Sequence, residues 1–288
     1  MNVPDGLGKT SAGFALSYAA IRAVLVIKYL RAIRHVPVAR PLSTRFTLGF
    51  TFAAATWMAS AFVPVPLRFG LWALGLAVDF GIPVSVGHLH AQLPPHASHL
   101  SERFGLFTLI VLGESVAAVV EGVTGQQWNI LSAVIAMLGL SIAFSLWWVY
   151  FDNLNGTAIR ALRAAGQVGI YQTWLHTHLP LVIGLTATGV GVRHIVSSKP
   201  GMGLSEAERW LICSAVALCL LALEVIHRTT RSSETRLHNK VGTVYRLSAA
   251  AFVLILAVAG GNLLPIMLLA LVAATCAGQV VLDLRGES

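Results

Sequence analysis

Residues 102–115 read Glu-Arg-Phe-Gly-Leu-Phe-Thr-Leu-Ile-Val-Leu-Gly-Glu-Ser. A charged pair, Glu102 and Arg103, opens an apolar helix that carries a second carboxylate, Glu114, at its middle. Apolar runs of about 20 residues, the length of a membrane-spanning helix, recur along the whole chain. The pattern predicts an all-α, polytopic transmembrane helical bundle. In a bilayer an ionised acid such as Glu114 costs roughly 2.5–3.5 kcal/mol, so it usually marks a pathway or a paired site.

The composition agrees with a membrane protein and argues against a nucleic-acid partner. Of 288 residues, 56% are hydrophobic and only 11% are charged, whereas soluble domains contain about 25% charged residues. The net charge of +8 comes from basic residues in short segments between apolar runs, as in cytoplasmic membrane loops. No extramembrane stretch is long enough to bury a core of its own, so we expect one membrane domain over residues 1–288.

We expect about nine helices, within a range of eight to ten. Their expected ranges are 11–30, 46–64, 68–87, 102–121, 128–150, 170–192, 209–227, 244–260 and 262–282. Most Lys and Arg residues fall in the inner segments if the N-terminus lies outside. The sequence therefore predicts an N-terminus outside and a C-terminus in the cytoplasm.

Three acidic residues fall within the expected spans, against one base of comparable depth. The acids are Asp79, Glu114 and Glu224, and the base is Arg22. Three acids cannot all form simple salt bridges with one arginine, so at least one acid should be protonated, exposed to water or bonded to polar neighbours. This imbalance favours proton or cation chemistry.

The helix around Glu114 predicts a line of charges. Arg103 and Glu114 are 11 residues apart, which places them within about 20° of each other around the helix axis. Glu121 follows Glu114 by seven residues and again lies within about 20° of it. Ser115 lies beside this line, and Gly113 is expected to let a neighbouring helix approach closely. The alternative is that Glu114 only holds helices together through a hydrogen bond or ion pair.

Histidines suggest polar contacts but no metal site. His176 and His178 are two residues apart and point to different faces of a helix, so they cannot both bind one metal. Pro180 leaves the carbonyl of His176 without a helical partner, and for His178 we favour an interhelical hydrogen bond or a proton relay. Four further histidines, expected in a solvated loop, are His88, His90, His96 and His99. We predict no metal and no cofactor, and no known catalytic motif is present.

The stretch from His99 to Ser115 closely resembles the signature of the bacterial low-temperature-requirement A (LtrA) family of membrane proteins. Residues 18–22, 147–152 and 178–184 look like further parts of the same family pattern. Family members usually begin with extra helices that bear a Glu-Leu-Phe-Phe-Asp-Leu-Val-Phe-like motif, and this motif is missing from the sequence. The resemblance therefore implies a family member of the bacterial plasma membrane that lacks those N-terminal helices here. Two explanations stay open: Met1 is an internal start, or this is a shortened member.

The function that we favour at this stage is a transporter or channel-like protein for protons, cations or a small solute. The expected buried polar site comprises Arg22, Asp79, Glu114, Ser115 and His178. The expected cytoplasmic gate comprises Glu102, Arg103 and Asp152. The expected partners are the lipid bilayer and a small solute or ion, and we leave a homo-oligomer open.

Two other classes of function stay open. In the first, the protein is a membrane-embedded enzyme on lipid or quinone, with Glu114 and His178 as acid and base and the loop histidines holding a metal. In the second, it is a non-catalytic, stress-related membrane scaffold in which Glu114 only holds helices together. We favour a protein that is not an enzyme.

Overall fold

The computed structural model describes residues 11–86, 100–124, 130–152, 168–197, 203–230 and 240–286. These residues form nine α-helices and two short 3-10 turns, and no strand occurs among them. The chain divides into two compact units, Met1–Pro95 and His96–Ser288, which we call unit 1 and unit 2. The single membrane domain expected over residues 1–288 stays a prediction.

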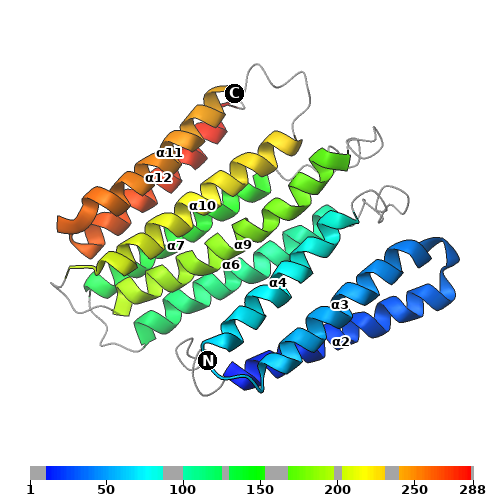
Figure 1. Cartoon of the computed structure of the whole chain (residues 1–288). Helices are drawn as coiled ribbons and strands as arrows, with labels where there is room; N and C mark the ends of the chain where they lie inside the picture. Colours follow the sequence, from blue (N-terminus) through cyan, green and yellow to red (C-terminus); the bar gives the residue numbers. More distant parts are fainter. Residues whose placement is uncertain are drawn as a thin grey trace. The chain divides into compact units, whose positions relative to one another are not determined.

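The described residues of unit 1, 11–86, form three helices joined by short connections (Figure 1). They are α2 (Ser11–His35), α3 (Arg40–Ser60) and α4 (Leu67–Ser85), with the 3-10 turn η1 (Pro37–Ala39) between the first two. Helix α3 packs against both α2 and α4. It begins six residues before the expected start, because Pro41 falls in its first turn, where a proline costs no helical hydrogen bond.

Six helices are found in the part of unit 2 that the structure describes (Figure 1). They are α6 (Leu100–Thr124), α7 (Ile130–Asp152), α9 (Val168–Ser197), α10 (Glu206–Thr230), α11 (Lys240–Ala259) and α12 (Pro265–Gly286). Helix α9 packs against α6, α7 and α10, while α11 packs against α10 and α12, and α12 also contacts α7. The main hydrophobic core of the chain lies between these helices.

Glycines on α9 allow its neighbours to approach closely. A Cβ atom at Gly189 would lie 2.8 Å from the Cα of Ser115 on α6, and one at Gly184 would lie 2.7 Å from the Sγ of Cys219 on α10. The expectation for Gly113 was wrong in the described part of the chain, because a Cβ there meets nothing within 4 Å. The close contact with α6 is made from the α9 side instead.

Eight of the nine described helices are long and apolar enough to cross a membrane. The exception is α3, whose first turns hold Arg40, Thr44 and Arg45 and so lower its mean hydropathy. Large apolar side chains such as Ile110 (70% exposed) and Val258 (69%) lie uncovered on the helix surfaces, as lipid contact requires. The expected all-α, polytopic helical fold is confirmed, with most helices longer than their expected ranges.

Candidate functional site

Unit 1 holds a buried ion pair between α2 and α4. The Nη2 atom of Arg22 lies 3.0 Å from Oδ2 of Asp79, whose side chain is 3% exposed. The hydroxyl of Tyr18 donates a hydrogen bond of 3.1 Å to the same oxygen, and Arg22 in turn donates to that hydroxyl. The charge of this intramembrane acid is therefore balanced within the unit.

Aromatic rings surround this pair. The guanidinium of Arg22 lies 4.8 Å from the ring centre of Tyr18 and 5.4 Å from that of Phe50, both within cation–π range. Trp57 packs 4.1 Å from Tyr18, and Gly75 leaves room for its indole, since a Cβ there would lie 2.6 Å from Nε1. Among the described residues, Oδ1 of Asp79 is buried without a hydrogen bond, so the pair keeps one acceptor that is not used.

Unit 2 contains a larger buried network centred on Arg246 of α11, whose side chain is 1% exposed. Its Nη1 atom lies 3.2 Å from Oε2 of Glu224 on α10. Its Nη2 atom donates to both carboxylate oxygens of Asp283 on α12, at 3.0 and 2.9 Å. One arginine thus links three helices by charge-assisted hydrogen bonds.

The remaining members complete the charge balance of this network. The other oxygen of Glu224 accepts hydrogen bonds from Nε of Arg228 at 2.7 Å and from the hydroxyl of Thr243. Nδ1 of His227 accepts from Arg246, because a guanidinium can only donate. A neutral His227 therefore carries its proton on Nε2, which lies 3.1 Å from a backbone carbonyl of α7. Among the described contacts of this network, the two carboxylates Glu224 and Asp283 face the two arginines Arg228 and Arg246, so these four charges balance.

The third acid, Glu114, lies in a different setting. The side of α6 that faces the other helices of unit 2 includes Thr108, Leu112 and Ser115, which are buried. Glu114 is exposed on the opposite side, and no hydrogen bond or ion pair reaches it from the described residues. The same side carries Arg103 and Glu121, also exposed. We call Arg103, Glu114 and Glu121 the outward charges of α6.

Ser115 joins α6 to α9. Its hydroxyl lies 2.9 Å from the carbonyl oxygen of Leu185 and 3.1 Å from that of Val111. Ser115 faces α9 while Glu114 faces outward, so these two consecutive residues lie on different sides of α6. The contact of Ser115 is therefore an interhelical one, made at the position where Gly189 allows the two backbones to approach.

The three residues expected to form a gate lie at one end of unit 2. Glu102 and Arg103 are exposed in the first turn of α6, and Asp152 is exposed at the last residue of α7. Because α6 and α7 follow one another and pack together, the start of one lies at the same end as the finish of the other. Their action as a gate stays a prediction.

His178 makes the interhelical hydrogen bond that the sequence favoured. Its Nε2 atom lies 3.1 Å from the hydroxyl of Tyr150 on α7, and its Nδ1 atom lies 2.8 Å from the carbonyl of Trp174. Since a carbonyl can only accept, the neutral ring holds its proton on Nδ1 and accepts from Tyr150. His178 contacts α6 at Phe104, with ring centres 4.5 Å apart. This contact is ten residues, or about 15 Å, along the helix from Glu114.

The five residues expected to share one polar site are thus found in separate settings. Arg22 and Asp79 pair within unit 1, whereas Glu114, Ser115 and His178 belong to unit 2. A site common to both groups stays a prediction. The described residues contain no cluster of three or more His, Cys, Asp and Glu side chains that could hold a metal. The loop histidines, His88, His90, His96 and His99, lie outside the described residues.

Sequence reasoning missed Arg246, Asp283, His227 and Tyr18 as members of buried polar clusters. Arg246 lies near the start of the expected helix 244–260, where the sequence predicts a positive charge at the inner membrane face, but its side chain is buried. The turn η4 (Gly260–Asn262) joins α11 and α12, so the sequence could have indicated that the two helices pack as a hairpin. It could not have given the pairing, because Arg246 lies fewer residues from the turn than Asp283 does.

Eight apolar spans among the described residues, with a buried ion pair in each unit, define a multi-pass integral membrane protein. The chain belongs to the bacterial low temperature requirement A protein (LtrA) family, whose model matches residues 1–281. The resemblance noted in the sequence is thereby confirmed.

A curated relative is the uncharacterized protein RA0937 of Rhizobium meliloti (strain 1021), which is 24% identical over 188 residues. The aligned region covers 62% of this chain and 46% of the relative, so the chain spans about half the length of that protein. No solved structure matches the chain. The family therefore supports a membrane location and leaves the activity to be argued from the residues.

Proposed function

We propose that this protein is a transporter or channel-like protein that moves protons, cations or a small solute across the bacterial plasma membrane. One observation carries the proposal. Of the three acids within the spans, Asp79 and Glu224 each have an arginine nitrogen within 3.2 Å, while Glu114 has no such partner in the described part of the chain. An unpaired carboxylate within a span is costly to keep charged and is suited to bind and release a proton or a cation.

The other two outward charges of α6 lie on either side of Glu114 along the helix. Arg103 lies about 16 Å along the helix on one side of Glu114, and Glu121 lies about 10 Å along it on the other. Glu121 is itself paired with Arg193 of α9 at 3.1 Å. These gaps are too long for direct proton transfer, so water or a solute must connect the positions. Glu114 would then act as a single binding position near the middle of the span.

The other expected site residues have supporting roles in this proposal. Arg22 and Asp79 form a neutral pair with one unused acceptor, which a cation or a proton can occupy. Ser115 fixes the rotation of α6, so that Glu114 stays on the outward side. Glu102, Arg103 and Asp152 form the gate at the cytoplasmic end, with the N-terminus outside and the C-terminus in the cytoplasm.

The test is proton and cation flux in proteoliposomes that contain equal amounts of folded protein. We expect Glu114→Gln to abolish flux, because the amide cannot exchange a proton or carry charge, and Glu114→Asp to retain part of it. The matched control is Glu206→Gln, which makes the same chemical change at an exposed position in the first turn of α10. Equal flux in Glu114→Gln and the wild type would rule out this role for Glu114.

The same experiment separates the rival classes. A scaffold predicts no flux in any variant and a change only in stability when Glu114 is replaced. An enzyme that uses Glu114 and His178 together would need them to meet at one substrate. His178 of α9 contacts α6 at Phe104, which is about 15 Å along that helix from Glu114. A bound quinone, lipid product or stoichiometric metal in the purified protein would favour the enzyme.

A further inference from the structure

Unit 1 carries an exposed group of basic side chains around the connection between α2 and α3. This basic patch consists of Lys28, Arg31, Arg34, Arg40 and Arg45, all of which are exposed. The sequence contains no Asp or Glu between Asp5 and Asp79, so no carboxylate of the same stretch offsets their charge. Such a concentration of positive charge at the ends of spans is complementary to an anionic leaflet.

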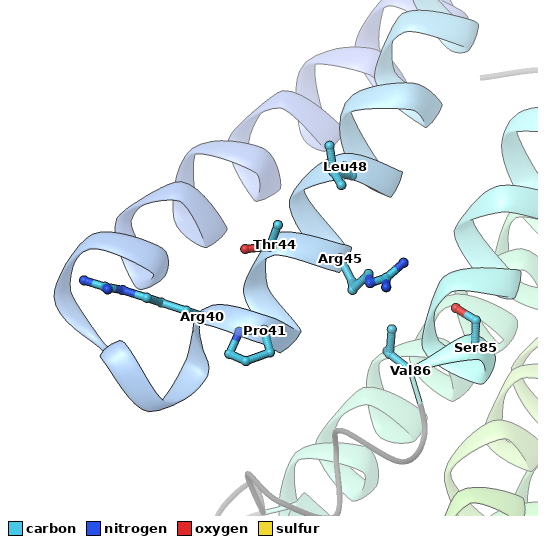
Figure 2. Close-up of a pocket in the computed structure, with 7 residues that line it drawn as sticks. All are labelled: Arg40, Pro41, Thr44, Arg45, Leu48, Ser85 and Val86. Carbon is cyan, nitrogen blue, oxygen red and sulfur yellow. The ribbon is translucent and has the colours of Figure 1, made fainter.

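Part of the basic patch borders a pocket between the start of α3 and the end of α4. The pocket has a volume of about 800 Å³ and is lined by Arg40, Pro41, Thr44, Arg45, Leu48, Ser85 and Val86. In Figure 2 the side chain of Arg45 extends from α3 toward Ser85 and Val86, while Arg40 turns the other way. Nε of Arg40 donates to the carbonyl of Ile33 at 3.1 Å. The described residues offer Arg45 no hydrogen bond or ion pair.

The pocket is polar at one end and apolar along its wall. Arg45 supplies guanidinium donors, and the hydroxyl of Ser85 donates its proton to the carbonyl of Ile82 at 2.8 Å, which leaves its oxygen free to accept. Leu48 is 64% exposed one turn further along α3. Beyond it the two helices close, because a Cβ at Gly49 would lie 1.8 Å from Cδ1 of Ile82.

We propose that this pocket binds the headgroup of an anionic phospholipid from the leaflet that the basic patch faces. Arg45 binds the phosphate, Ser85 accepts a hydrogen bond from a headgroup hydroxyl such as those of glycerol, and the acyl chains follow the apolar wall at Leu48. A free phosphate ion would use the guanidinium alone and gain nothing from that wall. The combination of charge, acceptor and apolar surface therefore assigns the pocket to a lipid.

The test is a binding titration of the purified full chain in neutral detergent micelles, with phosphatidylglycerol, phosphatidylcholine and inorganic phosphate as probes. We expect phosphatidylglycerol to bind more tightly than phosphatidylcholine. Arg45→Gln should weaken that binding about tenfold or more, the loss of one charge-assisted hydrogen bond. The matched control, Arg31→Gln, removes the same charge from the basic patch outside the pocket and should weaken binding less than about threefold. A second variant, Leu48→Trp, keeps the charge and obstructs the wall, so it should also weaken binding.

Three results would overturn the proposal. Equal binding of the two lipids would remove the role of the anionic headgroup. Equal effects of Arg45→Gln and Arg31→Gln would show a diffuse attraction to the basic patch without a pocket. Displacement of the lipid by inorganic phosphate at a similar concentration would assign the pocket to a soluble anion.

Discussion

Replacing Arg246 by methionine removes a buried cation from between two carboxylates, and we expect the free energy of unfolding to fall by about 3–5 kcal/mol. The arginine side chain is 1% exposed and makes one contact of 3.2 Å with Glu224 and two of 3.0 and 2.9 Å with Asp283. Methionine is apolar and fills part of the same volume. The loss would therefore reflect carboxylate charge that is left inside the protein without this arginine.

A second arginine on the same carboxylate provides the control. Arg228 bonds Glu224 at 2.7 Å, a shorter contact than that of Arg246, but its side chain is 55% exposed. Solvent screens such a pair, so Arg228→Met should cost only about 0–1 kcal/mol. The comparison separates burial from contact distance, because distance alone predicts the opposite order.

The assay is equilibrium unfolding in mixed detergent micelles, followed by tryptophan fluorescence and circular dichroism. A double variant, Arg246→Met with Asp283→Asn, removes one of the two buried carboxylate charges and should recover part of the lost stability. Equal costs for Arg246→Met and Arg228→Met would refute the view that the buried network stabilises the contacts among α10, α11 and α12. The absence of any recovery in the double variant would contradict the charge argument.

Two further substitutions test the packing of α9. Gly189→Ala should destabilise the protein by about 1–3 kcal/mol, since its Cβ would lie 2.8 Å from the Cα of Ser115 and the helices must move apart. Gly113→Ala is the control in thermal unfolding, because its Cβ meets nothing within 4 Å, and a larger loss there would contradict the packing described. Tyr150→Phe should cost about 1 kcal/mol by removing the hydrogen bond to His178. In a His178→Phe background, Tyr150→Phe should no longer lower the free energy of chemical unfolding, because the hydrogen bond is already absent. If Tyr150→Phe costs the same in both backgrounds, the hydrogen bond to His178 is not the cause of that cost.

Local sequence properties were sufficient to predict the class of protein and to predict which residues share one side of α6. A span requires only length and apolarity, so the apolar runs predicted nine spans, and eight of the nine described helices are long and apolar enough to cross a membrane. The exception is α3, expected over 46–64, whose first turns are polar. The helical repeat placed Arg103, Glu114 and Glu121 on one side of α6, and all three are exposed. Both inferences depend on residues within one segment.

Only the tertiary structure decided which charges are neutralised. Arg246 and Asp283 are 37 residues apart and Tyr18 and Asp79 are 61 apart, so their pairing depends on which helices pack together and in which rotation. The sequence counted three acids against one base because it could not show that Arg246 is buried. Of the three acids that the sequence placed deep in the spans, Asp79 and Glu224 are each paired with an arginine, whereas Glu114 has no ion pair with a described residue. The sequence by itself determined a multi-pass helical membrane protein, and the packing of its helices decided which of these carboxylates lie beside an arginine.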